Sequence, residues 1–530
     1  MENKIPVLIV GAGPSGLFMA ACLKRYGISF RIIDKQVKPV TTSNAIVIQT
    51  RTLEMWDDMG LLTHALSRGN VIKQLSIYSK EKKLACIPFD LLQSHYPFIL
   101  GLAQSETERM LHDHLKQQSV LIETEVELIN FSEENGSVMT TLRHKDGHTE
   151  TLHADWLIAA DGSHSFIRDK THLEFRGKEF DQHFMLADFL INSDIAQHEI
   201  CLFFSKGGPL IIARYNQDHV RVIAEVTHDK KLSRAKWLTD EDLQDIMRER
   251  CPFPMKINAA SWTSGFWIHE RLISNYRHGP LFFLGDAAHI HSPAGGQGMN
   301  TGLQDAYNLA WKLALVIQKR AQPSLLSSYQ DERYGVAKEV LKNTTGLTRI
   351  MTIRNPLLKK IRNFILILLA RSRWFLQKIA MMVTELSVNY MKSPLTKDCL
   401  RQASATAAGK RMLDGHVDSK RLLDYVRGKE HCLLVFCGVL HFPEEGTLVH
   451  LKNTLQQHYP QLIKILFITT EEKKAGNGVL FDKDQSLHQL YGVKEPSLYL
   501  IRPDKYIGFR CALRHSEELS AYLNKIFLVS

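Results

Sequence analysis

The sequence predicts an α/β fold of several domains. Three observations support this: a length of 530 residues, a glycine-rich turn between a strand-like and a helix-like segment near the N-terminus, and alternating apolar and polar residues in the middle of the chain. At ~150 residues per domain, this length corresponds to three or four folding units. Apolar residues make up 44% and charged residues 23%, which excludes a disordered or collagen-like protein.

The glycine-rich turn, Gly-Ala-Gly-Pro-Ser-Gly, follows a continuous apolar run that is typical of a strand buried on both faces. Gly11 would make the tight turn, Gly13 would let a pyrophosphate approach the backbone, and Gly16 would let helix and strand pack closely. Asp34 ends the next predicted strand, 23 positions after Gly11, where its carboxylate can accept hydrogen bonds from a ribose. The pattern predicts a dinucleotide site without saying which dinucleotide binds.

Two further predicted strands end in an acid. Asp161 and Asp286 follow apolar runs, and a glycine-rich loop at 292–300 then leads into a helix rich in small residues at 302–314. A carboxylate at a strand end can hold a polyol hydroxyl group. Backbone N–H groups of a glycine-rich loop can reach a ring carbonyl and stabilise negative charge there.

Together these segments resemble the class A flavin-dependent aromatic monooxygenases, the para-hydroxybenzoate and phenol hydroxylase-like family, over roughly residues 5–345. The resemblance implies a Rossmann-like FAD-binding domain with an inserted antiparallel β-sheet domain for the substrate. The three glycines of the turn would hold the FAD pyrophosphate, Asp34 the adenosine ribose and Asp286 the ribityl chain. Gln104 matches a position on the flavin side of the cofactor, and the backbone of Val126 would meet the adenine.

The resemblance also implies contacts beside the flavin ring. Gly298, Met299 and Asn300 would place backbone groups near its pyrimidine edge, and Pro293 would place its carbonyl group beside it. Asp161 belongs to an Asp-Gly motif that serves both FAD and NAD(P)H binding in this family.

One segment departs from the family pattern. Many members carry an Arg followed by Ala ahead of the helix that begins near residue 51, and that Arg reaches the cofactor. Here Asn44 precedes Ala45, so hydrogen bonding is kept and the charge is lost.

The activity implied is hydroxylation of a phenolic or polycyclic aromatic small molecule with NAD(P)H and O2, through a flavin C4a-hydroperoxide. The sequence has no second complete Gly-x-Gly-x-x-Gly motif and no redox Cys pair after the first turn, so NAD(P)H is expected to bind transiently. Alternatives are a related flavin oxidoreductase that acts on a quinone or isoprenoid or inactivates an antibiotic, and a flavoprotein scaffold without catalysis. We assign no metal site and no catalytic base.

We expect the substrate pocket to be built by residues 72–98 and 176–278, where alternation at 210–226 predicts an antiparallel sheet. The candidate polar or aromatic side chains of this pocket are His183, Arg214, Tyr215, Trp262 and His269. For each of them taken individually, we favour a structural role in the sheet.

Positive charge is concentrated in one segment. Nine basic residues and a single acid, Glu385, lie within 349–392, and they account for +8 of the net charge of +10. The segment predicts basic amphipathic helices, which could lie on a membrane surface. We favour helices that pack on the protein with a solvated basic face, because most amphipathic helices cover a core. No motif for nucleic-acid binding accompanies the charge, so no nucleic-acid partner is expected.

The C-terminal third resembles the thioredoxin-like tail of the phenol hydroxylase branch, above all in the segment 500–510. It lacks the Cys-x-x-Cys motif that thioredoxin chemistry needs, and Cys432 and Cys437 do not replace it. We therefore predict a redox-inert module that serves packing or homodimer contacts. Eight scattered cysteines and the absence of a leader-like pattern predict a cytoplasmic protein with reduced thiols.

These inferences give a domain plan. It comprises an FAD-binding domain in three parts, a substrate domain in two parts, a basic helical segment and the thioredoxin-like domain. In chain order the boundaries are 1–75 (FAD), 76–97 (substrate), 98–175 (FAD), 176–278 (substrate), 279–345 (FAD), 346–398 (basic helices) and 399–530 (thioredoxin-like).

Overall fold

The computed structural model describes residues 4–37, 45–191, 195–253, 257–292, 295–400, 406–440, 442–472 and 478–528. The chain divides into two compact units. The first unit holds residues up to 21, then 30–306 and 337–387, and the second holds 22–29, 307–336 and 388 onward. The finer domain boundaries given above remain predictions.

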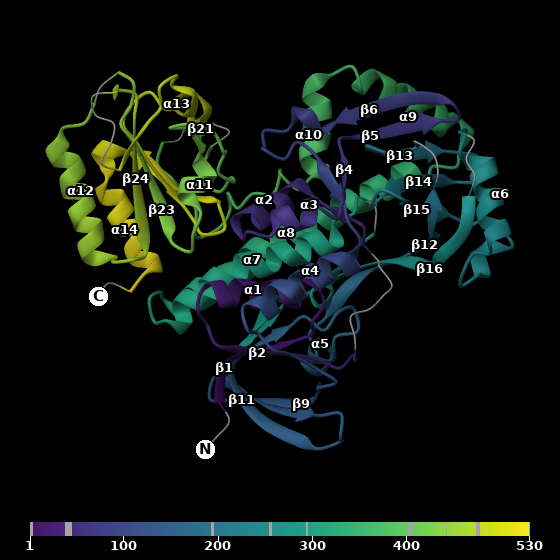
Figure 1. Cartoon of the computed structure of the whole chain (residues 1–530), viewed down its shortest axis with the longest axis horizontal. Coiled ribbons are helices and arrows are strands. Elements are labelled where there is room, and N and C mark those ends of the chain that lie inside the picture. Colours follow the sequence, from purple (N-terminus) through teal and green to yellow (C-terminus); the bar gives the residue numbers. More distant parts are fainter. Residues whose placement is uncertain are drawn as a thin grey trace. The chain divides into compact units, whose positions relative to one another are not determined.

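The first sheet of the first unit carries the predicted glycine-rich turn (Figure 1). Its central strands are parallel, and their apolar residues are fully buried, as expected for strands covered on both faces. Its order is β17 (Arg277–His278), β18 (Leu281–Phe283), β11 (Thr149–Ala159), β1 (Lys4–Val10), β2 (Phe30–Asp34) and β8 (Ile122–Thr124), with β9 (Glu127–Glu134) and β10 (Ser137–Arg143) joined to β11.

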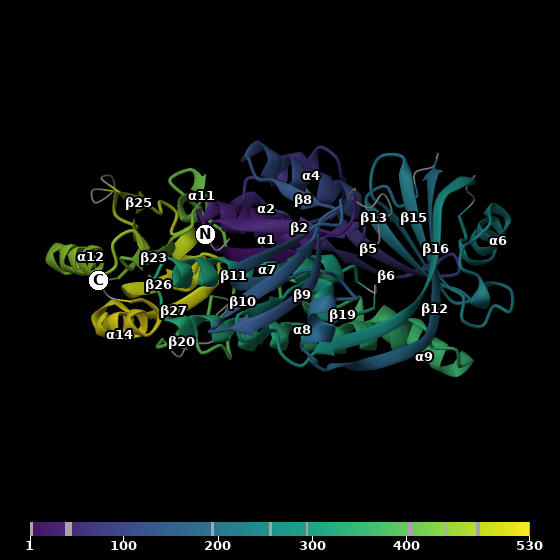
Figure 2. The same ribbon diagram turned by 90° about the horizontal axis from the view of Figure 1, so that it is seen from below.

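The second sheet is antiparallel except where β13 runs parallel to β5. Its two longest strands, β12 and β16, have 17 residues each and run side by side (Figure 2). The alternation at 210–226 predicted such a sheet, and β14 and β15 pair there. The order is β19 (His289–Ile290), β16 (Ile257–Ile273), β12 (Phe175–Ile191), β15 (His219–Glu225), β14 (Pro209–Arg214), β13 (Glu199–Phe204), β5 (Gln74–Ser79) and β6 (Lys82–Pro88).

Helices and one small sheet complete the first unit. The small sheet joins β3 (Val47–Ile48), β7 (Ile99–Gly101) and β4 (Asn70–Ile72). The helices are α1 (Pro14–Arg25), α2 (Thr50–Asp58), α3 (Leu62–Leu66), α4 (Gln104–Gln117), α5 (Phe166–Lys170), α6 (Asp240–Arg250), α7 (Gly298–Ile317), α8 (Ser327–Met351), α9 (Pro356–Leu369) and α10 (Arg373–Val383), of which α1, α7 and α8 extend into the second unit. In the described residues, none of the helices combines the length and the apolar character that a membrane span requires.

The second unit contains a six-stranded mixed sheet in which β23 pairs parallel with β24 and antiparallel with β26. The order is β20 (Lys397–Asp398), β27 (Ile507–Ala512), β26 (Ser497–Ile501), β23 (His431–Phe436), β24 (Ile463–Thr469) and β25 (Val479–Phe481). The remaining elements are β21 (His416–Val417), β22 (Lys420–Arg421), α11 (Leu422–Val426), α12 (Glu445–His458), α13 (Ser486–Tyr491) and α14 (Glu517–Ile526).

Cys432 and Cys511 lie in strands of this sheet and are buried thiols. Strand β23 ends at Phe436, so Cys437 follows the strand. Burial raises the pKa of Cys432 to about 12, whereas a redox thiol needs a lowered pKa. The thioredoxin-like assignment itself remains a prediction.

A buried ionic network, here called the Glu332 network, lies in the second unit. Arg502 donates to both carboxylate oxygens of Glu332, from Nη1 at 2.6 Å and from Nη2 at 2.8 Å, and also to Asp504. Lys312 Nζ donates to Glu332 Oε2 at 2.7 Å, and Ser393 Oγ donates to Oε1 at 2.6 Å. Burial alone would raise the pKa of Glu332, but the two cations outweigh burial and lower it strongly. Every carboxylate oxygen of Glu332 is thus hydrogen-bonded.

Candidate functional site

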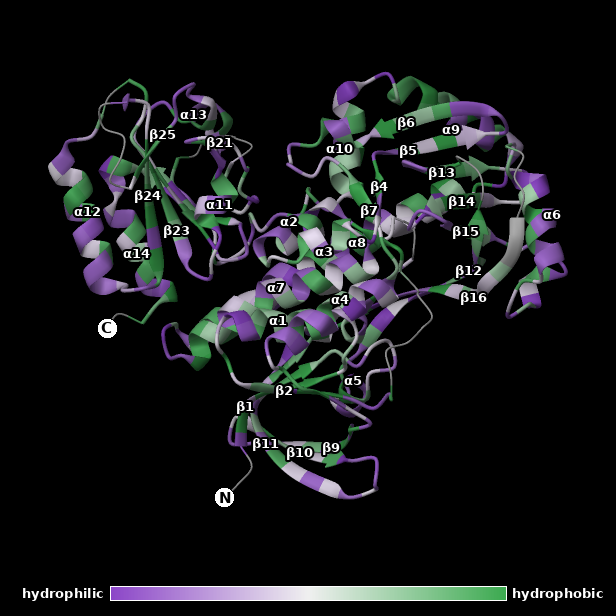
Figure 3. Cartoon of the chain, viewed as in Figure 1, coloured by the Kyte–Doolittle hydropathy of each residue, from purple (hydrophilic) through white to green (hydrophobic). Residues whose placement is uncertain are grey.

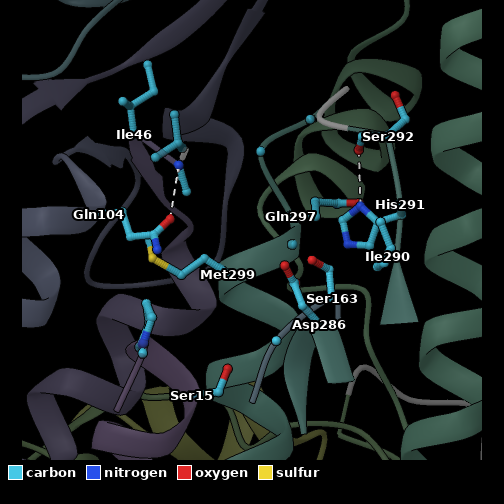
Figure 4. A pocket seen from close by; sticks show the side chains of 18 of the residues that line it. Ser15, Ile46, Gln104, Ser163, Asp286, Ile290, His291, Ser292, Gln297 and Met299 are labelled. Carbon is cyan, nitrogen blue, oxygen red and sulfur yellow. Dashed lines mark hydrogen bonds between the residues drawn. The ribbon is translucent and has the colours of Figure 1, made fainter. Parts of the chain in front are cut away.

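A cavity of about 1380 Å³ lies in the first unit and is lined by residues of both large sheets. Its volume exceeds the ~300–1,000 Å³ of an ordinary small-molecule pocket. The cavity therefore has room for a dinucleotide together with a second molecule. Figure 4 shows part of its wall, with Asp286, Ser163, Gln104 and Met299 among the labelled side chains.

Two glycines of the turn, Gly11 and Gly13, line the cavity. A Cβ atom at Gly11, which has a φ of +105°, would lie 2.2 Å from the Ala160 carbonyl oxygen, and one at Gly16 would lie 1.9 Å from that of Gly11. These two glycines are required by close packing. A Cβ at Gly13 would meet no protein atom within 4 Å. Gly13 thus leaves open space in front of the first turn of α1, whose N–H groups favour an anion.

Asp34 is held in place by the backbone. Its Oδ2 accepts a hydrogen bond from Ala12 N at 2.7 Å and its Oδ1 accepts one from Gln36 N at 2.8 Å. The backbone N of Val126 donates to the carbonyl oxygen of Asp34 at 3.0 Å, which brings both residues to one end of the cavity. Each carboxylate oxygen can accept a further hydrogen bond from a ligand.

Two other acids face the cavity with spare hydrogen-bonding capacity. Asp161 Oδ2 accepts from Ile167 N at 3.3 Å, but its buried Oδ1 has no hydrogen-bond partner within the described part of the chain. Asp286 lines the cavity, and its surface is exposed. Burial raises the pKa of both carboxyl groups, and the nearby His289 lowers that of Asp286 to a smaller extent. A carboxyl group that lines a cleft, has a raised pKa and keeps an unused acceptor oxygen is a candidate binding group.

Gln104 begins α4 and bridges two segments. Its Oε1 accepts from Ala45 N at 3.3 Å, and its Nε2 donates to Glu108 Oε1 at 2.9 Å (Figure 4). Glu108 also lines the cavity, and burial raises its pKa. Sequence reasoning missed Glu108, although a residue four positions after Gln104 on a helix lies on the same face.

The loop before α7 contributes backbone to the wall. Gly298 and Met299 line the cavity. The side-chain amide of Asn300 makes four hydrogen bonds within the protein. Its Oδ1 accepts from Gln49 N and Thr52 Oγ1, and its Nδ2 donates to the carbonyl oxygens of Val47 and Gly296. Its side chain therefore secures the loop to β3. Pro293 lies outside the described residues, as does Asn44.

His289 and His291, which precede the loop before α7, differ in their hydrogen-bond partners. His289 is buried and its Nε2 lies 2.9 Å from Asp305 Oδ2. His291 lines the cavity (Figure 4), and its Nδ1 donates to the Ser292 carbonyl oxygen at 3.0 Å. Burial and, to a smaller extent, the charge of His289 lower the pKa of His291 to about 4. The Nε2 of His291 is a neutral acceptor without a partner among the described residues.

The other half of the cavity is apolar and was only partly predicted. The second sheet supplies Leu75, Ile77, Ile87, Leu202, Phe204, Ile211, Ala213 and Phe266, as expected, but the helices add Leu347, Met351, Leu366, Phe375, Leu376, Ile379 and Val383. Among the five candidate side chains of the sheet, His269 alone lines this cavity, within the described residues. Arg221 lines it as well, and its Nε and Nη2 each donate to Asp188 at 2.7 Å.

The structure thus brings most of the sequence-predicted cofactor residues to one wall. Gly16 and Asn300 are not among the residues that line the cavity. The residues that line the cavity are Gly11, Gly13, Asp34, Gln104, Val126, Asp161, Asp286, Gly298 and Met299.

Comparison with known proteins agrees with this geometry. The family model described as "FAD binding domain" matches residues 4–344. The chain is similar to 6-methylpretetramide 4-monooxygenase of Streptomyces rimosus (31% identical, covering 99% of this chain and 94% of the relative) and to pentachlorophenol 4-monooxygenase of Sphingobium chlorophenolicum (28%, 97% and 95%). The crystal structure of the flavin-dependent monooxygenase PieE with FAD and substrate shares the fold, with a TM-score of 0.81 at 19% identity, covering 98% of this chain and 99% of that one.

Proposed function

The chain belongs to the FAD-binding domain family and is an FAD-dependent monooxygenase of the aromatic hydroxylase type, and from this premise we propose that it hydroxylates an apolar aromatic molecule with NAD(P)H and O2. The observation that carries the proposal is the division of one cavity into a polar half beside the glycine turn and an apolar half beneath the second sheet. A wall of aliphatic side chains binds an aromatic ring by removing apolar surface from water.

The residues of the polar half fit FAD. The open space at Gly13 and the N-terminus of α1 suit the pyrophosphate, and Asp34 suits the adenosine ribose beside Val126. Asp286 would bind the ribityl chain, and Asp161 would serve FAD and NAD(P)H. Toward the ring we assign Gln104 and the backbone of Gly298, Met299 and Asn300, together with Pro293. When bound, FAD supplies electron transfer from NAD(P)H and activation of O2.

The protein's own part in the reaction is to bind, orient and exclude water. The apolar half desolvates the substrate, which strengthens every hydrogen bond inside the site. His291 Nε2, neutral at physiological pH because its pKa is about 4, can accept a hydrogen bond in the cavity. Arg221 is fixed by Asp188 and can hold an anionic oxygen without moving. No catalytic base is assigned.

The test uses the purified flavin-loaded protein, a panel of phenols of increasing size, NADH or NADPH, and an oxygen electrode. We expect some phenols to accelerate NAD(P)H and O2 consumption and to gain one oxygen atom by mass spectrometry. Flavin binding without any compound that gains oxygen would contradict the proposal.

A matched variant locates the substrate. Ala213 lies in the apolar half, so Ala213→Phe should lower turnover of the larger phenols at least tenfold while flavin content stays the same. The control is Leu121→Ala at an exposed position away from the cavity lining, which should change neither quantity.

A further inference from the structure

Helix α9 presents apolar side chains to solvent. Leu357, Ile361, Phe364 and Leu368 follow one another at helical spacing and are all exposed, Leu357 by 65% and Phe364 by 68%. Leu358 and Ile365 lie beside them and are exposed as well. Figure 3 shows the apolar character of this helix. Monomeric proteins seldom leave a contiguous apolar stripe of this kind uncovered.

The orientation of α9 is fixed by polar contacts on its inner face. Arg362 is buried, its guanidinium carbon lies 3.5 Å from the centre of the Phe204 ring, and its Nη1 donates to the Ile350 carbonyl oxygen at 3.2 Å. Asn363 Nδ2 donates to Ser79 Oγ at 3.2 Å. Since these two residues anchor the inner face, the apolar stripe must point outward.

Basic side chains surround the stripe. Trp374, at the start of α10, is 69% exposed, and Lys378 Nζ lies 5.0 Å from the centre of its ring. Lys360, Arg371 and Arg373 are also exposed, and the sequence contains no acid from 346 to 384. We call Leu357, Leu358, Ile361, Phe364, Ile365, Leu368 and Trp374, with Lys360, Arg371, Arg373 and Lys378, the α9–α10 surface.

The opposite side of the same two helices forms cavity wall. Leu366 and Ala370 of the α9 segment, and Leu376, Ile379 and Val383 of α10, line the apolar half. The α9–α10 surface and the proposed substrate site are therefore separated by the thickness of one helix layer.

We propose that the α9–α10 surface docks on an anionic lipid bilayer, from which an apolar substrate enters the cavity. An exposed Leu/Ile/Phe/Trp face combined with Lys and Arg is the signature of a helix that lies in the bilayer interface. Each basic side chain near an anionic membrane adds to the attraction. A second copy of the chain fits poorly, because a two-fold contact would set the same cations against each other without acids to pair them.

Docking is tested with the full-length flavin-loaded protein and sedimentation with vesicles. We expect binding to phosphatidylcholine vesicles that contain phosphatidylserine, and at least tenfold weaker binding to phosphatidylcholine alone or at high salt. The double variant Phe364→Ser/Trp374→Ser should lose at least tenfold in binding, whereas Trp237→Ser, at a tryptophan that is 64% exposed elsewhere in the first unit, should not.

Charge is tested separately. Lys360→Glu/Arg371→Glu/Lys378→Glu should abolish vesicle binding, and Lys429→Glu/Lys452→Glu/Lys494→Glu, with the same change in net charge, should retain it. Equal loss in both triple variants would overturn the proposal, since it would mean binding through net charge alone. A change of oligomeric state in the Phe364/Trp374 variant without lipid would overturn it in favour of an interface between copies.

The entry of substrate from the bilayer rests on the proposed function and needs its own measurement. For an apolar phenol dissolved in anionic vesicles, the apparent KM of the Phe364/Trp374 variant should rise at least tenfold, with kcat and the KM for a water-soluble phenol unchanged. An unchanged KM in vesicles would overturn entry from lipid while leaving docking intact. Failure with both phenols in the wild-type protein would instead contradict the proposed function.

Discussion

The second unit surrounds Glu332 with donors from Arg502, Lys312 and Ser393. In the cavity wall of the first unit, by contrast, Asp161 Oδ1 has no partner among the residues that the structure describes, and Asp286 is exposed. Both regions contain carboxyl groups with shifted pKa values, but the shifts run in opposite directions: cations lower the pKa of Glu332, and desolvation raises the pKa values of the two aspartates. The difference distinguishes an acid whose partners all lie within the protein from acids that we propose bind FAD.

The largest expected effect is in the Glu332 network. Glu332→Gln leaves Arg502 and Lys312 as buried cations without their main counter-charge, so the free energy of unfolding should fall by ~3–5 kcal/mol. Denaturant titration measures the free energy of unfolding. The control is Glu81→Gln in an exposed turn, which should leave it unchanged. If the free energy of unfolding fell by less than ~1 kcal/mol, as it does for a surface ion pair, Glu332 would not differ from the cavity acids in its contribution to stability.

In the glycine turn of the first unit, Gly16 and Gly13 allow the same distinction between a structural and a ligand-binding role to be tested. Gly16→Ala places a Cβ against the Gly11 carbonyl oxygen and should cost ~1–3 kcal/mol of stability. Gly13→Ala meets no protein atom, so stability should stay the same while FAD affinity falls at least ~10-fold, or about 1.4 kcal/mol. Chemical denaturation and flavin absorbance distinguish the two; equal destabilisation by both would show that Gly13 has a packing role.

Replacing the Asp286 carboxylate should stabilise the folded, flavin-free protein. Because its folded pKa is raised, its contribution is fully present below the unfolded pKa of ~3.9 and is lost as pH rises through the folded value. Asp286→Asn should therefore raise the stability of the flavin-free protein at neutral pH, and FAD affinity should fall. Thermal unfolding at acid and neutral pH checks the first effect, and destabilisation at neutral pH would contradict it.

The smallest effect concerns His291. With a pKa of about 4 it is neutral throughout the ordinary working range, so the pH profile of kcat/KM should show no ionisation from this group at pH ~5–8. His291→Gln keeps an acceptor and should leave that profile unchanged. A histidine ionisation near pH ~6.5 that disappears in the variant would show that burial does not control this side chain.

Local sequence patterns were sufficient to predict most of the part of the first unit that contains the glycine-rich turn. The run that became β1, the glycines after it and the acid that ends β2 depend on neighbouring residues and on packing that only glycine allows, so their placement followed from sequence. The role of α9 and α10 as cavity wall did not follow, because periodicity shows that a helix has an apolar face but not what that face covers. The same limit hid Arg221 and the use of the Asn300 side chain, since both depend on partners far away in the chain.

Strand β16 joins the two halves of the cavity. Along most of its length it pairs with β12, and at its end Arg271 and Leu272 pair with Ile290 and His289, next to the loop that precedes α7. Inserting or deleting one residue within β16 would turn its later side chains to the opposite face and shift that loop. Divergence in substrate range should therefore proceed through exchanges of side-chain type on this strand, while its length stays constant.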